Sequence, residues 1–74
     1  MDLSSISRSR KIGEIMQFIR NHPESTASIS VYRRVLGKAP EPRLIDSYFM
    51  NQQVEPILDA TPEEELDHYY TIIR

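Results

Sequence analysis

The side chains that most often carry catalysis or bind metals are scarce in this chain. It has no cysteine and two histidines, His22 and His68, so thiolate nucleophiles and cysteine-based zinc sites are excluded. His68 follows Glu64 by four residues, so the two can share one helix face and hold a divalent ion. Catalytic zinc generally needs three protein ligands, and an exposed i, i+4 pair explains the spacing more simply. The sequence therefore predicts no metal and no cofactor.

Motifs of covalent catalysis and of phosphate binding are missing as well. No serine lies in a Gly-x-Ser-x-Gly elbow. Gly13 and Gly37 are the only glycines, so no glycine-rich loop can cradle a phosphate. His22 precedes Pro23 in a polar stretch, where a solvated side chain is the simplest explanation. We therefore expect a protein that is not an enzyme.

Charge is distributed unevenly along the chain. Residues 1–43 hold eight of the nine cations and four acids, about +4, whereas residues 44–74 hold seven of the eleven acids and one cation, about −6. Such asymmetry bears on partners rather than on fold, and it can serve a polyanion, a second protein or the chain's own packing. The densest basic cluster is Arg8, Arg10 and Lys11. It lies at the expected start of a helix, where the helix dipole disfavours cations, so a role in binding becomes more attractive.

The length suits one small domain. An apolar fraction of 39% with 27% charged residues is ordinary for a globular chain. Without a disulfide, 74 residues form a marginal core that a partner or self-association would stabilise. No apolar run approaches the ~20 residues that cross a bilayer, and the N-terminus lacks the pattern of a signal peptide. A cytoplasmic location is therefore expected.

Two helices are predicted in the first half of the chain. The first covers about residues 10–21, with Ser7 or Ser9 as its cap and Pro23 limiting its end. Its apolar residues recur at i, i+3, i+4 and i+7 and are Ile12, Ile15, Met16 and Ile19. The second runs from a cap at Ser28 or Ser30 to Leu36, with Gly37 as its stop. A strand over 29–35 is the alternative, because β-branched residues alternate there with polar ones.

Two further helices are predicted in the second half. The first covers 42–53, begins with Pro42, is limited by Pro56 and buries a stripe of Leu44, Ile45, Tyr48 and Phe49. The next begins at Thr61-Pro62-Glu63-Glu64, with Thr61 as N-cap and Glu64 closing a capping box. Its stripe is Leu66, Tyr69, Tyr70 and Ile73, and a strand over 68–73 is the alternative. The fold class expected is therefore all-α, a single small domain of three to four short helices over 10–74 behind a flexible basic segment over 1–9.

The absence of catalytic motifs leaves binding as the expected activity. We predict a non-catalytic regulatory protein that binds and modulates another protein, steered by its basic residues and anchored by apolar ones. Small chains of this build are often adaptors or inhibitors that phages and mobile elements direct at host machinery, transcription included. The candidate protein-binding residues are Arg8, Arg10, Lys11, Arg33, Arg34, Tyr69, Tyr70 and Ile73.

DNA binding is the alternative. A short second helix, a glycine and a third helix give the outline of a helix-turn-helix domain. The helix over 42–53 would then read base edges with Arg43, Ser47, Asn51 and Gln52. Against this, the connection that contains Pro40 is long and stiff, and Glu41 and Asp46 lie where phosphates would bind. A third interpretation is a homodimer in which the two oppositely charged halves meet.

Overall fold

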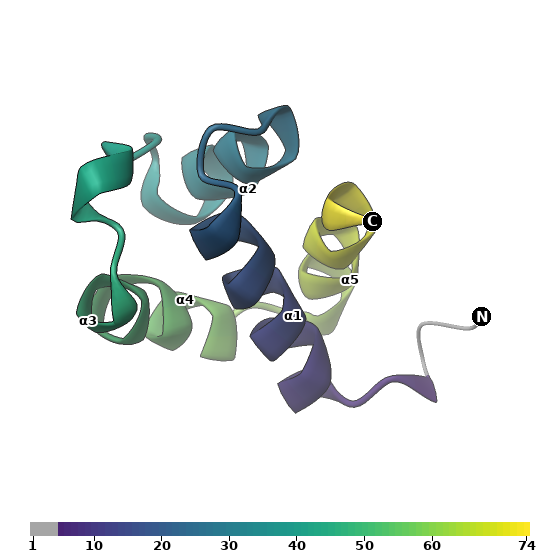
Figure 1. Cartoon of the computed structure of the whole chain (residues 1–74). Helices are drawn as coiled ribbons and strands as arrows, with labels where there is room; N and C mark the ends of the chain where they lie inside the picture. Colours follow the sequence, from purple (N-terminus) through teal and green to yellow (C-terminus); the bar gives the residue numbers. More distant parts are fainter. Residues whose placement is uncertain (1–4) are drawn as a thin grey trace.

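Helix α1 (Arg8–Asn21) crosses the middle of the molecule, and the other helices pack around it (Figure 1). The computed structural model describes residues 5–74. After α1 come α2 (Thr26–Leu36), the 3-10 turn η2 (Pro42–Leu44), α3 (Ser47–Phe49), the π-helical η3 (Met50–Val54), α4 (Glu55–Asp59) and α5 (Glu63–Ile73). Because α3, η3 and α4 follow one another without a gap, residues 5–74 form four helices and no strand. The predicted all-α class is confirmed, and the alternative strands at 29–35 and 68–73 are wrong.

Helix α1 follows its predicted apolar stripe and begins two residues earlier than expected. The side chain of Ser7 accepts a hydrogen bond from the backbone N–H of Arg10, so Ser7 is the N-cap. The helix ends at Asn21, directly before His22 and Pro23. Of the predicted segment over 1–9, residues 1–4 lie outside the described residues, and Ile6 is buried in the core.

Helix α2 begins earlier than predicted because Ser25, not Ser28 or Ser30, is its N-cap. The side chain of Ser25 accepts a hydrogen bond from the backbone N–H of Ser28. Ser28, Val31 and Tyr32 are buried on one face at helical spacing, and this burial outweighs the β propensity of the segment. Gly37 ends the helix as predicted, in the left-handed conformation with φ 84° that favours glycine.

The predicted helix over 42–53 is wrong in its start and its end, and of its predicted stripe only Ile45 and Phe49 pack against the core. Only the turn η2 forms at Pro42, and the chain is extended at Ile45 before Asp46 caps α3 by accepting a hydrogen bond from the N–H of Phe49. This interruption shifts the helical register, so that Leu44 and Tyr48 are exposed instead of buried. The helix also continues past Pro56, because the wide π turn before it accommodates a residue that lacks an N–H.

The predicted capping box of α5 is also wrong. Pro62 occupies the N-cap position in an extended conformation. The hydroxyl of Thr61 donates instead to the carbonyl of Ile57, near the end of α4, and thereby satisfies a terminal carbonyl of that helix. The three glutamates of the first turn, Glu63–Glu65, lie where the helix dipole favours anions.

The core is built from one face of each helix. From α5 it takes Leu66, Tyr69 and Tyr70, which pack with the buried isoleucines of α1 and with Val31 and Tyr32 of α2. The Tyr32 hydroxyl donates to the carbonyl of Ile19 at 3.0 Å, and burial raises the pKa of Tyr32 to about 12. All buried side-chain polar atoms of the described residues have a hydrogen-bond partner, so the core holds no polar group that calls for a ligand.

Candidate protein-binding surfaces

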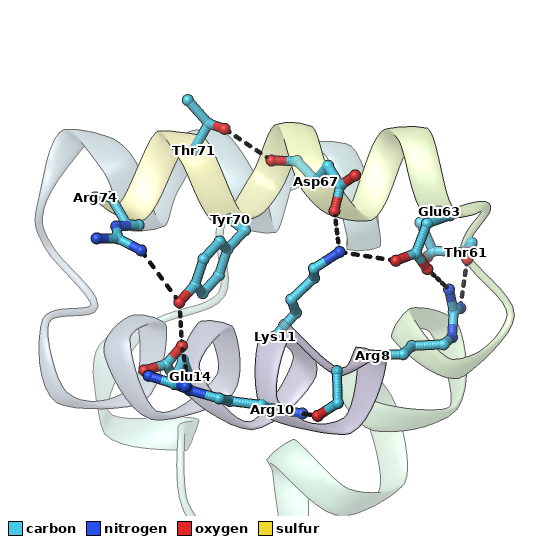
Figure 2. A network of polar contacts seen from close by, with 11 residues as sticks. Arg8, Arg10, Lys11, Glu14, Thr61, Glu63, Asp67, Tyr70, Thr71 and Arg74 are labelled. Atoms are coloured by element: carbon cyan, nitrogen blue, oxygen red, sulfur yellow. Dashed lines mark hydrogen bonds and ion pairs between the residues drawn. The ribbon is translucent and has the colours of Figure 1, made fainter. Parts of the chain in front are cut away.

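Lys11 joins α1 to α5. Its side chain is 1% exposed, and its Nζ donates to Glu63 Oε1 at 2.8 Å and to Asp67 Oδ1 at 2.5 Å (Figure 2). Both acids belong to α5 and face the same ammonium group. These bonds hold the pKa of Lys11 above its usual value, against the opposing effect of desolvation. Lys11, which the sequence predicted to contact a partner, therefore forms its ion pairs within the chain.

Arg8 joins α1 to the end of α4 and to the start of α5. One guanidinium nitrogen pairs with Glu63 Oε2 at 2.9 Å. The other donates to the backbone carbonyls of Leu58 at 3.1 Å, of Asp59 at 3.0 Å and of Thr61. Carbonyls at a helix end otherwise lack intrahelical partners, so Arg8 caps α4 from a distant part of the sequence.

The ion network predicts a pH window for stability. The hydrogen bonds from Lys11 and Arg8 hold the pKa of Glu63 below its usual value of 4.5. The folded state therefore binds this proton more weakly than the unfolded state, and the stabilisation is lost as pH falls through the folded pKa. The pKa of Lys11 is raised from 10.5, so its contribution is complete below that value and is lost as pH rises through the folded pKa.

When the pH is lowered from about 7 to about 3, the melting temperature of Glu63→Gln should fall less than that of the unsubstituted protein. Thermal unfolding followed by circular dichroism at several pH values measures this difference. Glu64→Gln is the matched control, because Glu64 is exposed and makes none of these bonds. Equal acid sensitivity of the Glu63 variant and the control would contradict the role given to Glu63.

Three of the remaining predicted residues, Arg10, Tyr70 and Ile73, line one surface hollow between α1 and α5. This α1–α5 hollow has a volume of about 420 Å³ and is also lined by Glu14, Gln17, Phe18, Asn21, His22 and Arg74. The Tyr70 hydroxyl donates to Glu14, and Arg74 lies over the Tyr70 ring, 5.4 Å from its centroid (Figure 2). Arg10 Nε lies 3.8 Å from Glu14. The polar groups of this hollow therefore engage mainly one another.

The other predicted protein-binding residues lie elsewhere. Tyr69 is buried and donates to Glu65 Oε1 at 2.9 Å, and burial, followed by this bond, raises its pKa to about 12. Arg33 and Arg34 are exposed in the last turn of α2. The structure thus places two of the eight predicted residues in the ion network, three in the α1–α5 hollow and two at the end of α2, and it buries the eighth, Tyr69.

The four residues of the DNA-binding alternative are exposed but do not lie on one regular helix. Arg43 belongs to η2, where its Nε pairs with Glu41 at 2.6 Å. Ser47 and Asn51 line a hollow of about 380 Å³ with Arg20 of α1, and Gln52 lies in the π-helical segment. Nine residues, 37–45, and the capping residue Asp46 separate α2 from α3, a longer connection than the short turn of a helix-turn-helix motif.

An apolar hollow lies where the sequence predicted a buried stripe. It has a volume of about 440 Å³ and is lined by Leu36, Lys38, Ala39, Pro40, Glu41, Leu44, Phe49 and Gln53. Leu44 is 55% exposed, and Tyr48, directly before the lining residue Phe49, is 73% exposed. Figure 1 shows this segment and α5 on opposite sides of α1. An exposed leucine at the wall of an apolar hollow is typical of protein-binding sites.

The apolar hollow was not predicted from the sequence, because the apolar stripe over 42–53 predicted that Leu44 and Tyr48 are buried. The signal that could have found it is Asp46, a favoured N-cap residue three positions before Phe49. A helix that starts after Asp46 leaves Leu44 in the preceding loop. Lys38, Ala39 and Pro40 carried no periodic pattern and could be assigned to the site only from the structure.

Comparison with known protein families, with curated proteins and with solved structures finds no match for this chain. Within residues 5–74, no cluster of three histidine, aspartate or glutamate side chains is arranged to hold a metal ion. None of the helices in this part of the chain has the length and apolar character needed to span a membrane.

Proposed function

We propose that this protein is a small non-catalytic regulatory module that binds another protein through the apolar hollow. The observation that carries the proposal is the exposure of Leu44 at the wall of a hollow whose other walls include Leu36, Pro40 and Phe49. Apolar area that stays in water is costly, and its burial by a partner is the main driving force of association. The volume lies within the usual range of roughly 300–1,000 Å³ for ligand pockets.

The α1–α5 hollow is the weaker candidate for this role. Its aromatic and charged side chains contact one another, as the Phe18 and His22 rings do at 5.0 Å, and Tyr70, Glu14 and Arg74 form a continuous hydrogen-bonded set. A partner would have to displace these contacts. Among residues 5–74, the apolar hollow is lined by no such set, and the one ion pair at its edge, Glu41–Arg43, is exposed and worth little in water.

Leu44→Ser should abolish capture of the partner while leaving the fold intact. Leu44 is more than half exposed, so the substitution should change stability by no more than about 0.5 kcal/mol. Tagged protein is incubated with lysate of the source cells, with and without nuclease, and each retained protein is then tested for direct binding as a purified component. Ile57→Ser is the matched control, because Ile57 is also partly exposed but does not line the hollow.

The proposal predicts a protein that binds directly and survives nuclease, is retained by the Ile57 variant and is lost with the Leu44 variant. Equal retention by both variants would contradict the assignment of the site. Retention that disappears on nuclease treatment would favour the DNA-binding alternative.

A further inference from the structure

We infer that the partner segment that fills the apolar hollow is acidic, with aspartate or glutamate side chains flanking its apolar anchors. This inference rests on the proposed function, and it adds the chemistry of the partner. It starts from the local charge of the surface. Residues 33–49 hold four cations and two acids, about +2, although the whole chain carries a formal net charge of −2.

Of these four cations, Arg43 pairs with Glu41, and the other three make no ion pair within the described part of the chain. Lys38 lines the hollow directly. Arg33 is exposed three residues before the lining residue Leu36 on α2, and with Arg34 it lines a separate hollow on that helix rather than the apolar hollow itself.

The acids near the hollow are already engaged. Glu41 pairs with Arg43 at 2.6 Å, and the carboxylate of Asp46 accepts the N–H of Phe49 at 2.7 Å. Asp46 keeps its negative charge in this bond, so the charges of residues 33–49 that have no ion pair are those of Arg33, Arg34, Lys38 and Asp46, about +2 in total. Unpaired rim charges steer the encounter and select partners of opposite sign.

The basic cluster at the start of α1 contributes little free positive charge. Its residues Arg8 and Lys11 form ion pairs with Glu63 and Asp67 of α5. Of the five cations without an ion pair in residues 5–74, Arg33, Arg34 and Lys38 lie at the end of α2 or directly after it, whereas Arg20 and Arg74 lie on other elements. A polyanion without apolar groups, such as a nucleic acid, would use the cations but would leave Leu44 and the hollow in water.

The inference is tested by selecting random peptides displayed on phage against the folded protein. Peptides that bind the unsubstituted protein but not Leu44→Ser are sequenced, synthesised and measured by fluorescence anisotropy. We expect these Leu44-dependent peptides to carry net negative charge around apolar anchors. The double variant Arg33→Glu with Lys38→Glu should weaken their binding roughly tenfold or more, whereas Arg20→Glu, which reverses an exposed cation in the last turn of α1, should change it little.

The outcomes separate the inference from the proposed function. Leu44-dependent peptides that are neutral or basic, or that bind the double variant unchanged, would overturn the inference and leave the binding site standing. Failure to obtain any Leu44-dependent peptide would contradict both. Sedimentation of the protein alone tests whether a second copy of the chain fills the hollow. Self-association that Leu44→Ser abolishes would show that it does. That result would also overturn the inference.

Discussion

Replacing Lys11 with methionine should lower the melting temperature by at least about 5 °C at neutral pH. Methionine keeps most of the apolar stem and removes the ammonium group that is within hydrogen-bond distance of Glu63 and Asp67. Asp67 then loses its only ion-pair partner among residues 5–74, and the two acids of α5 are left facing each other. Removal of one member of a buried charge cluster is costly because the other members remain. Thermal unfolding followed by circular dichroism measures the change.

Arg10→Met is the control for this substitution. Arg10 is the neighbouring cation, it is exposed, and its nearest acid, Glu14, lies 3.8 Å away. An exposed i, i+4 pair contributes only a few tenths of a kcal/mol, so the control should melt within about 2 °C of the unsubstituted protein. Equal melting temperatures for the two variants would show that the Lys11 network does not hold α1 to α5.

Leu66→Ala should reduce the free energy of unfolding by about 2–5 kcal/mol. Leu66 is fully buried at the contact of α5 with the rest of the core, and its truncation removes apolar contacts and leaves a cavity. A domain of 74 residues has a total stability of roughly 4–11 kcal/mol. The variant should therefore be partly unfolded at room temperature if the total lies at the low end of that range. Urea denaturation measures the loss.

Ile57→Ala is the matched control for Leu66→Ala, because Ile57 is a partly exposed apolar residue on α4. It should cost much less free energy of unfolding than Leu66→Ala, since its side chain already contacts water in the folded state. Equal losses for the two variants would contradict the packing of α5 in the core. Together with the Lys11 substitution, this experiment separates the apolar and ionic contributions that fix α5.

Three helices could be predicted from the sequence because each buries a regular apolar stripe. Ile12, Ile15 and Ile19 mark α1, and Leu66 with Tyr69 and Tyr70 marks α5. A helical period of apolar residues indicates which helix face is buried. Burial against other elements stabilises these helices more than local helix propensity does. For the same reason the helix boundaries were less certain. The caps at Ser25 and Pro62 depend on how the preceding loops approach the core, which no local pattern records.

The region from 42 to 59 was predicted wrongly because the apolar stripe was given more weight than the N-cap signal of Asp46, and because no sequence pattern indicated the π turn. Asp46 starts a new helix register that removes Leu44 from the buried face, and the π turn carries the chain past Pro56. The candidate binding site lies in this wrongly predicted region, where apolar residues that were expected in the core remain at the surface. An apolar residue that the fold leaves exposed is more informative about binding than one that it buries.

The ion pairs that the charged residues form also could not be predicted from the sequence. Lys11 and Glu63 are separated by 52 positions, and no local pattern predicts that they meet. Packing within the chain was one of three uses expected for the charge asymmetry, and the structure shows it at Arg8 and Lys11. The cations at the end of α2 make no ion pair within residues 5–74.

The measurement that tests the proposed site most directly is a two-dimensional NMR titration of isotope-labelled protein with the partner, or with a Leu44-dependent peptide. Binding at the apolar hollow predicts that the largest shift changes fall on residues 36–53, at Leu44 and its neighbours in the hollow. Backbone signals of Lys11 and Asp67 should stay in place. Changes concentrated instead on the α1–α5 hollow, at Arg10, Phe18 and Ile73, would contradict the account.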